Sequence, residues 1–346
     1  MIKKIILASS LALFCGGFTL NGLAEAGPAT GRPAEEIAAA AKKLLTSLDD
    51  AQRAKVVFDF KDEIQRKRWS NLPPGIFQRA GLRMGDLTQA QRDAVMAVLA
   101  AALSREGYQK VLEIIAADEA LKTTGGGGGR GSLNFGRDNY YVSFLGQPSA
   151  TEPWMIQFGG HHLGLNITLV GAQGTLAPSH TGVQPAMYEI EGKSVRPLGR
   201  EVDKAFALVN SLDEAQRKQA ILGFQMRDLV LGPGRDGQTI QPEGIKGSAL
   251  TGKQCDALLD LAGEWTGIMH EAVAKAKMEE LKKNVADTWF AWSGPAEKGG
   301  AAYFRIQGPT VFIEYAPQNM GGDATRHIHT IYRDPANEYG AKWLKR

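Results

Sequence analysis

The feature that most constrains the fold of this chain is an internal duplication. The segment SLDDAQR at 47–53 recurs as SLDEAQR at 211–217, and the blocks at 87–94, 138–146 and 159–181 recur at 250–257, 287–294 and 308–330. Four matched blocks in the same order indicate two copies of one unit. We therefore expect copy one to occupy residues 27–192 and copy two to occupy residues 193–346.

Each copy has a helical part followed by short strands. In both copies apolar residues first recur at helical spacing, and Ser47 and Ser211 are the N-cap residues that we predict for the first matched helix. Short β-branched and aromatic runs bounded by Gly and Pro then follow, which is typical of an antiparallel strand group. We predict an α+β fold with pseudo-twofold symmetry, in which the two strand groups pack together or join into one sheet.

The first 26 residues have the pattern of a signal peptide. Lys3 and Lys4 precede an apolar stretch at 5–18, and the sequence AEA at 24–26 is a typical cleavage site. We expect a periplasmic or secreted protein with no membrane span after cleavage. A lipoprotein anchored through Cys15 is less favoured, because the bulky Phe14 precedes the cysteine. Cleavage leaves Cys255 as the single cysteine, so no intrachain disulfide is expected.

The charge pattern points away from nucleic acid. The formal net charge is +3 and no run of Lys and Arg forms a phosphate-tracking patch. The glycine run at 125–129 lacks the Gly-Lys-Ser/Thr ending of a phosphate-binding loop, so it is interpreted as a connector. A small-molecule substrate or ligand remains the expected partner.

The strongest functional signal is the distribution of histidines, because five of the six lie in similar places in the two copies. His327 and His329 form a His-x-His on a predicted strand, where alternate side chains share one face with Ile331 and Arg333. Two imidazoles at this spacing are found in zinc, copper and iron sites. The alternative is a pair of exposed histidines on an edge strand beside an ion pair.

The first copy supplies His162, which we predict as the third metal ligand. His161 faces the opposite side of a regular strand, so it is interpreted as a core or outer residue of the site, unless Gly159 and Gly160 form a bulge. His180 aligns with His329, but its position beside Pro178 favours a turn residue over a fourth ligand. The sixth histidine, His270, is expected on a helix surface.

Two charged residues complete the hypothetical site. Glu314 interrupts the apolar strand at 311–315, where a carboxylate is costly unless it is paired or liganded. We predict it as a fourth ligand or general base, and Arg333 as the group that holds an anionic substrate or intermediate. The alternative is an ion pair between Glu314 and Arg333 or Arg326.

Two motifs resemble an exported bacterial family known as domain of unknown function 3500. These are the run PW..QFGGHHLGLN at 153–166 and the run HIHTIYRD at 327–334, together with Gly308-Pro309 and Ile313-Glu314-Tyr315. The resemblance covers nearly the whole mature chain. It implies no activity and supplies no catalytic residues.

Three functional hypotheses follow. The first is an exported metal-dependent enzyme, with a hydrolase favoured, whose ion lowers the pKa of a bound water. Zinc is the favoured divalent ion, with copper or iron as alternatives. The second is a non-catalytic periplasmic binding protein for an anionic small molecule. The third is a structural repeat protein in which the histidines are incidental.

Overall fold

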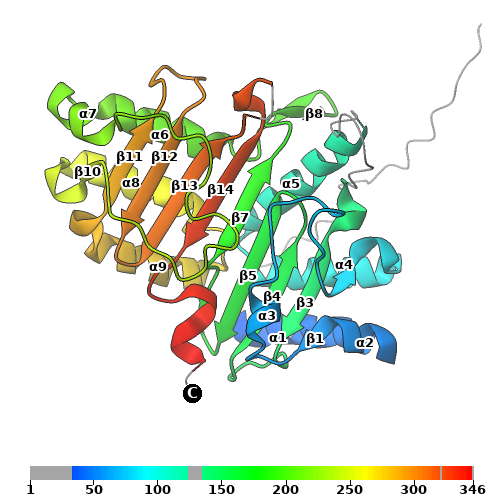
Figure 1. Cartoon of the computed structure of the whole chain (residues 1–346). Helices are drawn as coiled ribbons and strands as arrows, with labels where there is room; N and C mark the ends of the chain where they lie inside the picture. The colour runs from blue at the N-terminus through cyan, green and yellow to red at the C-terminus, as the bar shows by residue number, and fades with distance from the viewer. Residues whose placement is uncertain (1–32, 124–134, 320–321, 345–346) are drawn as a thin grey trace, which may run out of the picture. The chain divides into compact units, whose positions relative to one another are not determined.

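A single large sheet organises the part of the chain that the structure describes. The computed structural model describes residues 33–123, 135–319 and 322–344 (Figure 1). The predicted signal peptide and the glycine run therefore lie outside the described residues. The sheet has 12 strands and its main path is β1-β3-β4-β5-β7-β14-β13-β12-β11-β10, with β2 on β3 and β6 on β5.

The strands follow the aromatic and β-branched runs of the sequence. The first half of the sheet contains β1 (Val57–Phe58), β2 (Leu82–Arg83), β3 (Tyr141–Leu145), β4 (Trp154–Gly159), β5 (Leu163–Val170), β6 (Gln173–Thr175) and β7 (Ser179–Val183). The second half contains β10 (Ile245–Lys246), β11 (Trp289–Ser293), β12 (Tyr303–Gly308), β13 (Val311–Pro317) and β14 (Ile328–Arg333). A separate hairpin pairs β8 (Tyr188–Ile190) with β9 (Lys193–Val195). All pairings but that of β1 with β3 are antiparallel among these strands.

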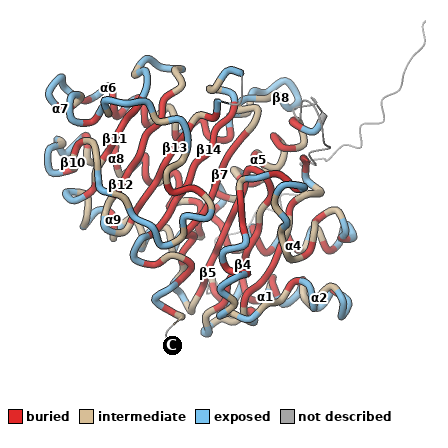
Figure 2. Tube along the Cα trace, viewed as in Figure 1, coloured by how far each residue is buried: buried red, intermediate tan, exposed pale blue. Residues whose placement is uncertain are grey.

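Helices precede the longer strands in each half of the chain, and the two-residue strands β1, β2 and β10 lie among them. The first set is α1 (Pro33–Thr46), α2 (Asp50–Val56), α3 (Glu63–Arg66), α4 (Gln89–Ala102) and α5 (Arg105–Thr123). The second is α6 (Gly199–Ser211), α7 (Glu214–Ala220), α8 (Gly252–Thr266) and α9 (Glu271–Lys283). Apolar residues of α1, α4, α6 and α8 share one buried cluster with the strands, which are buried along most of their length (Figure 2). The α+β prediction is confirmed.

The predicted N-caps lie two residues too early. The N-caps of α2 and α7 are Asp49 and Asp213, each of which accepts a hydrogen bond from the backbone N–H of a glutamine three residues later. Ser47 and Ser211 instead donate their hydroxyls to carbonyls of the preceding helix at 2.7 Å. Ser47 therefore directly follows α1 and Ser211 is the last residue of α6, and neither begins the next helix.

The centre of the sheet is the antiparallel pair β7–β14, which joins the two halves. Thr181 lies opposite Thr330, and their hydroxyls form a 2.7 Å hydrogen bond. From this pair outward, β5, β4 and β3 follow on one side and β13, β12 and β11 on the other. The predicted copy boundary falls in the turn of the β8–β9 hairpin. The duplication itself stays an inference from the sequence.

The second face of the sheet is covered by irregular segments rather than by long helices. A smaller apolar cluster there joins Trp69, Met155, Leu231, Ile331 and Tyr339. Strand β14 therefore alternates as predicted, with Ile328 and Tyr332 in the helix-side cluster and Ile331 on the opposite face. Within the described ranges, no helix is long and apolar enough to cross a membrane.

Candidate metal centre

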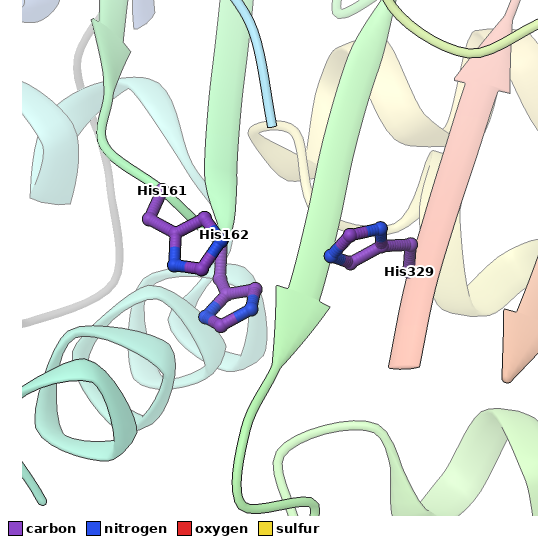
Figure 3. A group of neighbouring side chains, drawn as sticks. All are labelled: His161, His162 and His329. Atoms are coloured by element: carbon purple, nitrogen blue, oxygen red, sulfur yellow. The ribbon is translucent and has the colours of Figure 1, made fainter. Parts of the chain in front are cut away.

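Five histidines gather where β5 begins, β7 ends and β14 begins. His161 and His162 lie in the turn before β5, His180 lies in β7, and His327 and His329 lie at the start of β14. The ring centroids of His162 and His327 are 5.1 Å apart, and those of His180 and His329 are also 5.1 Å apart. Figure 3 shows His161 and His162 on one side of β7 and His329 on the other. The sixth histidine, His270, lies elsewhere, at the N-cap of α9.

Strand pairing explains why residues so distant in sequence meet. Gly182 donates its N–H to the carbonyl of His162 at 2.7 Å and lies opposite His329 in the sheet. A Cβ at Gly182 would lie 3.1 Å from His162 Cδ2 and 3.1 Å from His180 Nε2. The glycine thus leaves the space between these imidazoles free of a side chain.

His327 Nε2 lies next to two other Nε2 atoms in this space. His162 Nε2 is 3.1 Å from His327 Nε2, which is 3.0 Å from His329 Nε2. Ligands about 2.0–2.1 Å from a tetrahedral zinc ion lie about 3.3 Å from one another, so the observed spacing is close to that of a ligand set. A single N–H on His327 cannot satisfy both neighbours fully, so at least one of these short nitrogen–nitrogen contacts lacks a full hydrogen bond.

A second, overlapping trio could hold a metal ion. One ring nitrogen from each of His161, His162 and His329 lies within 4.8 Å of the others. The His161 ring stacks on His162 with centroids 3.9 Å apart, which places it beside the ligand position rather than between the other two rings. His162 and His329 belong to both trios. His327 does not belong to this second trio, and its contacts at 3.0 and 3.1 Å make it a further candidate ligand.

A buried carboxylate orients His162. Asp118 of α5 lies 2.5 Å from His162 Nδ1 through one oxygen and accepts the Tyr140 hydroxyl at 2.7 Å through the other. The contact places the proton on Nδ1 and leaves the Nε2 lone pair directed into the cluster. Histidine ligands of metals commonly have such a carboxylate partner, which fixes the ring and its tautomer.

His329 also has a side-chain partner, which lies in the loop at 70–80. Its Nδ1 lies 3.2 Å from the side-chain amide of Asn71. Arg79 holds this loop in place by donating to the carbonyls of Ser70 and Gly160. The amide nitrogen of Asn71 is the nearer atom and donates to Nδ1, so the neutral ring carries its proton on Nε2 and must lose that proton before Nε2 binds an ion.

The imidazoles are held in the neutral form. Burial lowers the pKa of His161 to about 2, and it lowers the pKa values of His180 and His327 to about 4. Burial and the neighbouring histidines hold the pKa values of His162 and His329 well below their usual range. Metal ligation requires neutral imidazoles, so the cluster is ready to bind an ion near neutral pH.

Three buried ring nitrogens in the cluster have no hydrogen-bond partner among the described residues. They are His161 Nδ1, His180 Nε2 and His327 Nδ1. Leaving a buried polar atom unpaired costs free energy, and such atoms are uncommon outside functional sites. His180 is thus part of the cluster and of a strand, so its interpretation as a turn residue was wrong.

Glu314 and Arg333 lie in a separate buried network. Glu314 accepts hydrogen bonds from the backbone N–H groups of Val230 and Leu231, both at 2.9 Å, and from the Tyr303 hydroxyl at 2.6 Å. Arg333 donates to the carbonyls of Leu231 and Gly232 and to Glu338. In the described part of the chain, no hydrogen bond or ion pair joins either residue to a histidine. Their contacts favour anchoring of the segment at 230–232.

Sequence reasoning missed Asp118, Tyr140 and Asn71. A signal for Asp118 existed, because it is a lone carboxylate on the apolar side of the helix that also carries Ile114 and Leu121. Tyr140 and Asn71 carry no comparable signal. Tyr140 lies in an aromatic run, and Asn71 lies in a loop rich in proline and glycine.

Comparison with known proteins identifies the family. No curated protein and no solved structure matches the chain. One family matches over residues 30–341, nearly the whole chain, and it is the one that the two histidine motifs resemble. The chain therefore belongs to the family described as Protein of unknown function (DUF3500).

Proposed function

We propose that this protein is a metal-dependent enzyme, with hydrolysis as its reaction and His162, His327 and His329 as its metal ligands. The observation that carries the proposal is the position of His327 Nε2, which lies 3.1 Å from His162 Nε2 and 3.0 Å from His329 Nε2. His161 lies beside the ligand set, with its ring stacked on that of His162. The neutral state of the rings and the carboxylate partner of His162 support the same reading.

Zinc is the ion that the donors favour. A set of three imidazoles without thiolate is typical of catalytic zinc, which keeps its fourth position for water. Zinc at such a site lowers the pKa of the bound water to about 7 and supplies hydroxide for hydrolysis. Copper and iron also bind imidazole, so metal analysis must decide among the three.

Burial limits the substrate to a small molecule. The three proposed ligands are at most 7% exposed, and no charged side chain other than that of Asp118 makes a hydrogen bond with them among the described residues. We do not assign a catalytic role to Glu314 or Arg333, because their polar atoms are engaged by backbone groups and by Tyr303 and Glu338.

The second candidate is a non-catalytic binding protein for an anionic small molecule, with no metal. The favouring observation is the set of unpaired ring nitrogens, which could donate to an anion if protonated. The lowered pKa values oppose protonation near neutral pH. We therefore rank this candidate below the metal site.

Export is part of the proposal and rests on the sequence pattern of the first 26 residues. We expect the mature chain to begin at Gly27, in the periplasm or outside the cell. The N-terminal sequence and intact mass of protein recovered from cell fractions test this. A chain that retains Met1 in the cytoplasm would contradict it.

The decisive experiment is elemental analysis of the full mature protein purified without a histidine tag. We expect about one equivalent of a transition metal, and its loss in a His162→Ala/His329→Ala double variant, because this double change removes two of three ligands. His270→Asn is the matched control, since His270 lies outside the cluster and asparagine can also cap α9. Folded, metal-free protein that takes up no zinc, copper or iron would refute the metal site.

Catalysis needs a separate test. Metal-loaded protein is screened against small esters, amides and phosphate esters, and any hydrolysis must disappear in the double variant but persist in His270→Asn. Stoichiometric metal without hydrolysis of any class would leave the metal site intact and refute the hydrolase assignment.

A further inference from the structure

A cavity of about 220 Å³ lies on the helix side of the sheet, apart from the histidines. Val183 and Ile328 form its floor, Phe206 of α6 and Tyr315 of β13 form its walls, and the turn at 298–301 borders it. Ile328 stands between His327 and His329 in sequence but faces the helices. No histidine lines this cavity.

Tyr315 presents an unpartnered hydroxyl to the cavity. Its side chain is 4% exposed, and its ring stacks on Phe304 with centroids 4.9 Å apart. Among the described residues, its hydroxyl makes no hydrogen bond, although Tyr140 and Tyr303 bind carboxylates through theirs. The hydroxyl is not among the fully buried unpaired atoms, so it is open to the cavity and can donate a hydrogen bond to a ligand there.

The rim of the cavity carries an excess of positive charge. Arg196 contacts Asp203 at 2.9 Å, and Lys298 lies 3.7 Å from the same carboxylate. Two cations therefore share one anion. Glu201, the next carboxylate along α6, forms an ion pair with Lys110 and does not line the cavity.

The first turn of α6 adds to this positive field. Leu198 and Gly199 line the cavity, and the N-cap residue Leu198 makes no side-chain hydrogen bond to the helix. The N–H of Gly199 donates to the Arg196 carbonyl, so it is the helix dipole that favours an anion at this end. The helix has 13 residues, so its dipole is well developed.

We propose that this cavity binds a small organic carboxylate with an apolar body, of about the size of benzoate. The carboxylate accepts a hydrogen bond from Tyr315 and lies in the field of Arg196, Lys298 and the α6 N-terminus. The apolar body packs on Val183, Phe206 and Ile328. The volume suits this ligand, because a cavity of about 150 Å³ holds benzene. This inference is independent of the proposed metal site.

Titration of the full mature protein with benzoate, followed by calorimetry or NMR, tests the proposal. A ligand of this size should bind with a Kd on the order of 1 mM. Tyr315→Phe keeps the ring and its stacking but removes the donor, and it should weaken binding about ten-fold, as expected for a hydrogen bond to a charged group. Lys298→Ala should weaken binding by a smaller factor of about three, because Lys298 is exposed.

The controls separate this site from general anion binding. Lys218→Ala on α7 removes an exposed lysine away from the cavity and should leave the Kd unchanged. Benzyl alcohol, which has the ring but no charge, should bind more weakly than benzoate. The proposal is overturned by any of three results: no saturation at about ten times the expected Kd, equal binding by Tyr315→Phe and the wild type, or equal binding of benzyl alcohol and benzoate.

Discussion

Two buried polar clusters lie on the same face of β14, and they differ in how their polar atoms are satisfied. At one end of the strand, Arg333 donates three hydrogen bonds and Glu314 on the neighbouring strand accepts three. At the other end, His327 and His329 belong to a group with three unpaired ring nitrogens. In the first cluster, hydrogen bonds offset the free-energy cost of burying polar atoms. In the second cluster, this cost is not offset for the three unpaired nitrogens. The comparison indicates that the first cluster maintains the fold, whereas the second keeps ring nitrogens that the fold itself does not engage.

The largest effect should come from breaking the satisfied cluster. Arg333→Ala leaves the carbonyls of Leu231 and Gly232 and the carboxylate of Glu338 without their donor, so we expect a loss of about 3–5 kcal/mol in the free energy of unfolding. Urea unfolding measures this loss. Arg326→Ala removes an exposed arginine just before β14 and should change stability by about 0.5 kcal/mol or less. Metal content per folded molecule should stay unchanged in both variants. If only Arg333→Ala lost metal, Arg333 would contribute to the metal site, and the two clusters would not be separate.

The second-largest effect should come from a change at Asp118, the carboxylate that contacts His162. Asp118→Asn removes the charge that fixes the tautomer of His162, and we expect metal affinity to fall about 10–100-fold. Competition with a chelator of known affinity measures this change. Glu119→Gln alters the adjacent, more exposed carboxylate and should leave the affinity near that of the wild type. Equal affinities for Asp118→Asn and wild type would show that the Asp118 contact only stabilises the fold.

A third change tests the space between the imidazoles. Gly182→Ala places a methyl group about 3 Å from His162, His180 and the Ile328 carbonyl, so the rings must move. We expect overpacking of about 1–3 kcal/mol, expressed mainly as weaker metal binding. Gly263→Ala on α8 is the matched control, because its Cβ meets no atom within 4 Å and alanine favours the helix. Unchanged metal affinity in Gly182→Ala would mean that the ion lies elsewhere.

The smallest effect concerns the acid stability of the metal-free protein. An unfolded histidine titrates near 6.5, whereas burial lowers the pKa of His327 to about 4. Between these values the unfolded chain binds more protons, so acidification destabilises the fold, by up to about 1.4 kcal/mol per pH unit for one such group. His327→Gln removes this group and should flatten the fall in stability across that range. If the free energy of unfolding fell equally with pH in the variant and in the wild type, the neutral, buried state of His327 would be contradicted.

Much of the architecture could be predicted from the sequence because it depends on local pattern. The two strand groups, the alternation along β14 and the convergence of His162 with His327 and His329 all follow from periodicity and from the matched blocks. The N-caps were misplaced because serine and aspartate both cap helices, and only the true end of α1 decides between them.

The partners of the histidines could not be predicted, because they depend on how separate elements pack. Asp118 reaches His162 only when α5 lies against the sheet in one register, and Asn71 depends on a loop held by Arg79. Glu314 and Arg333 show the converse problem. A buried charge produces the same sequence signal whether a backbone amide or a substrate satisfies it, and only the contacts distinguish the two.

The position of the cluster at the β7–β14 seam has a consequence for how the chain unfolds. His162 and His327 are 165 residues apart in sequence, and Cys255 is the only cysteine in the described part of the chain. An ion bound by both would act as a cross-link between the halves of the sheet. Closing a loop of this length lowers the entropy of the unfolded chain by an amount worth about 5 kcal/mol, as a disulfide would. Removal of the ion would then be the step that lets β7 and β14 separate.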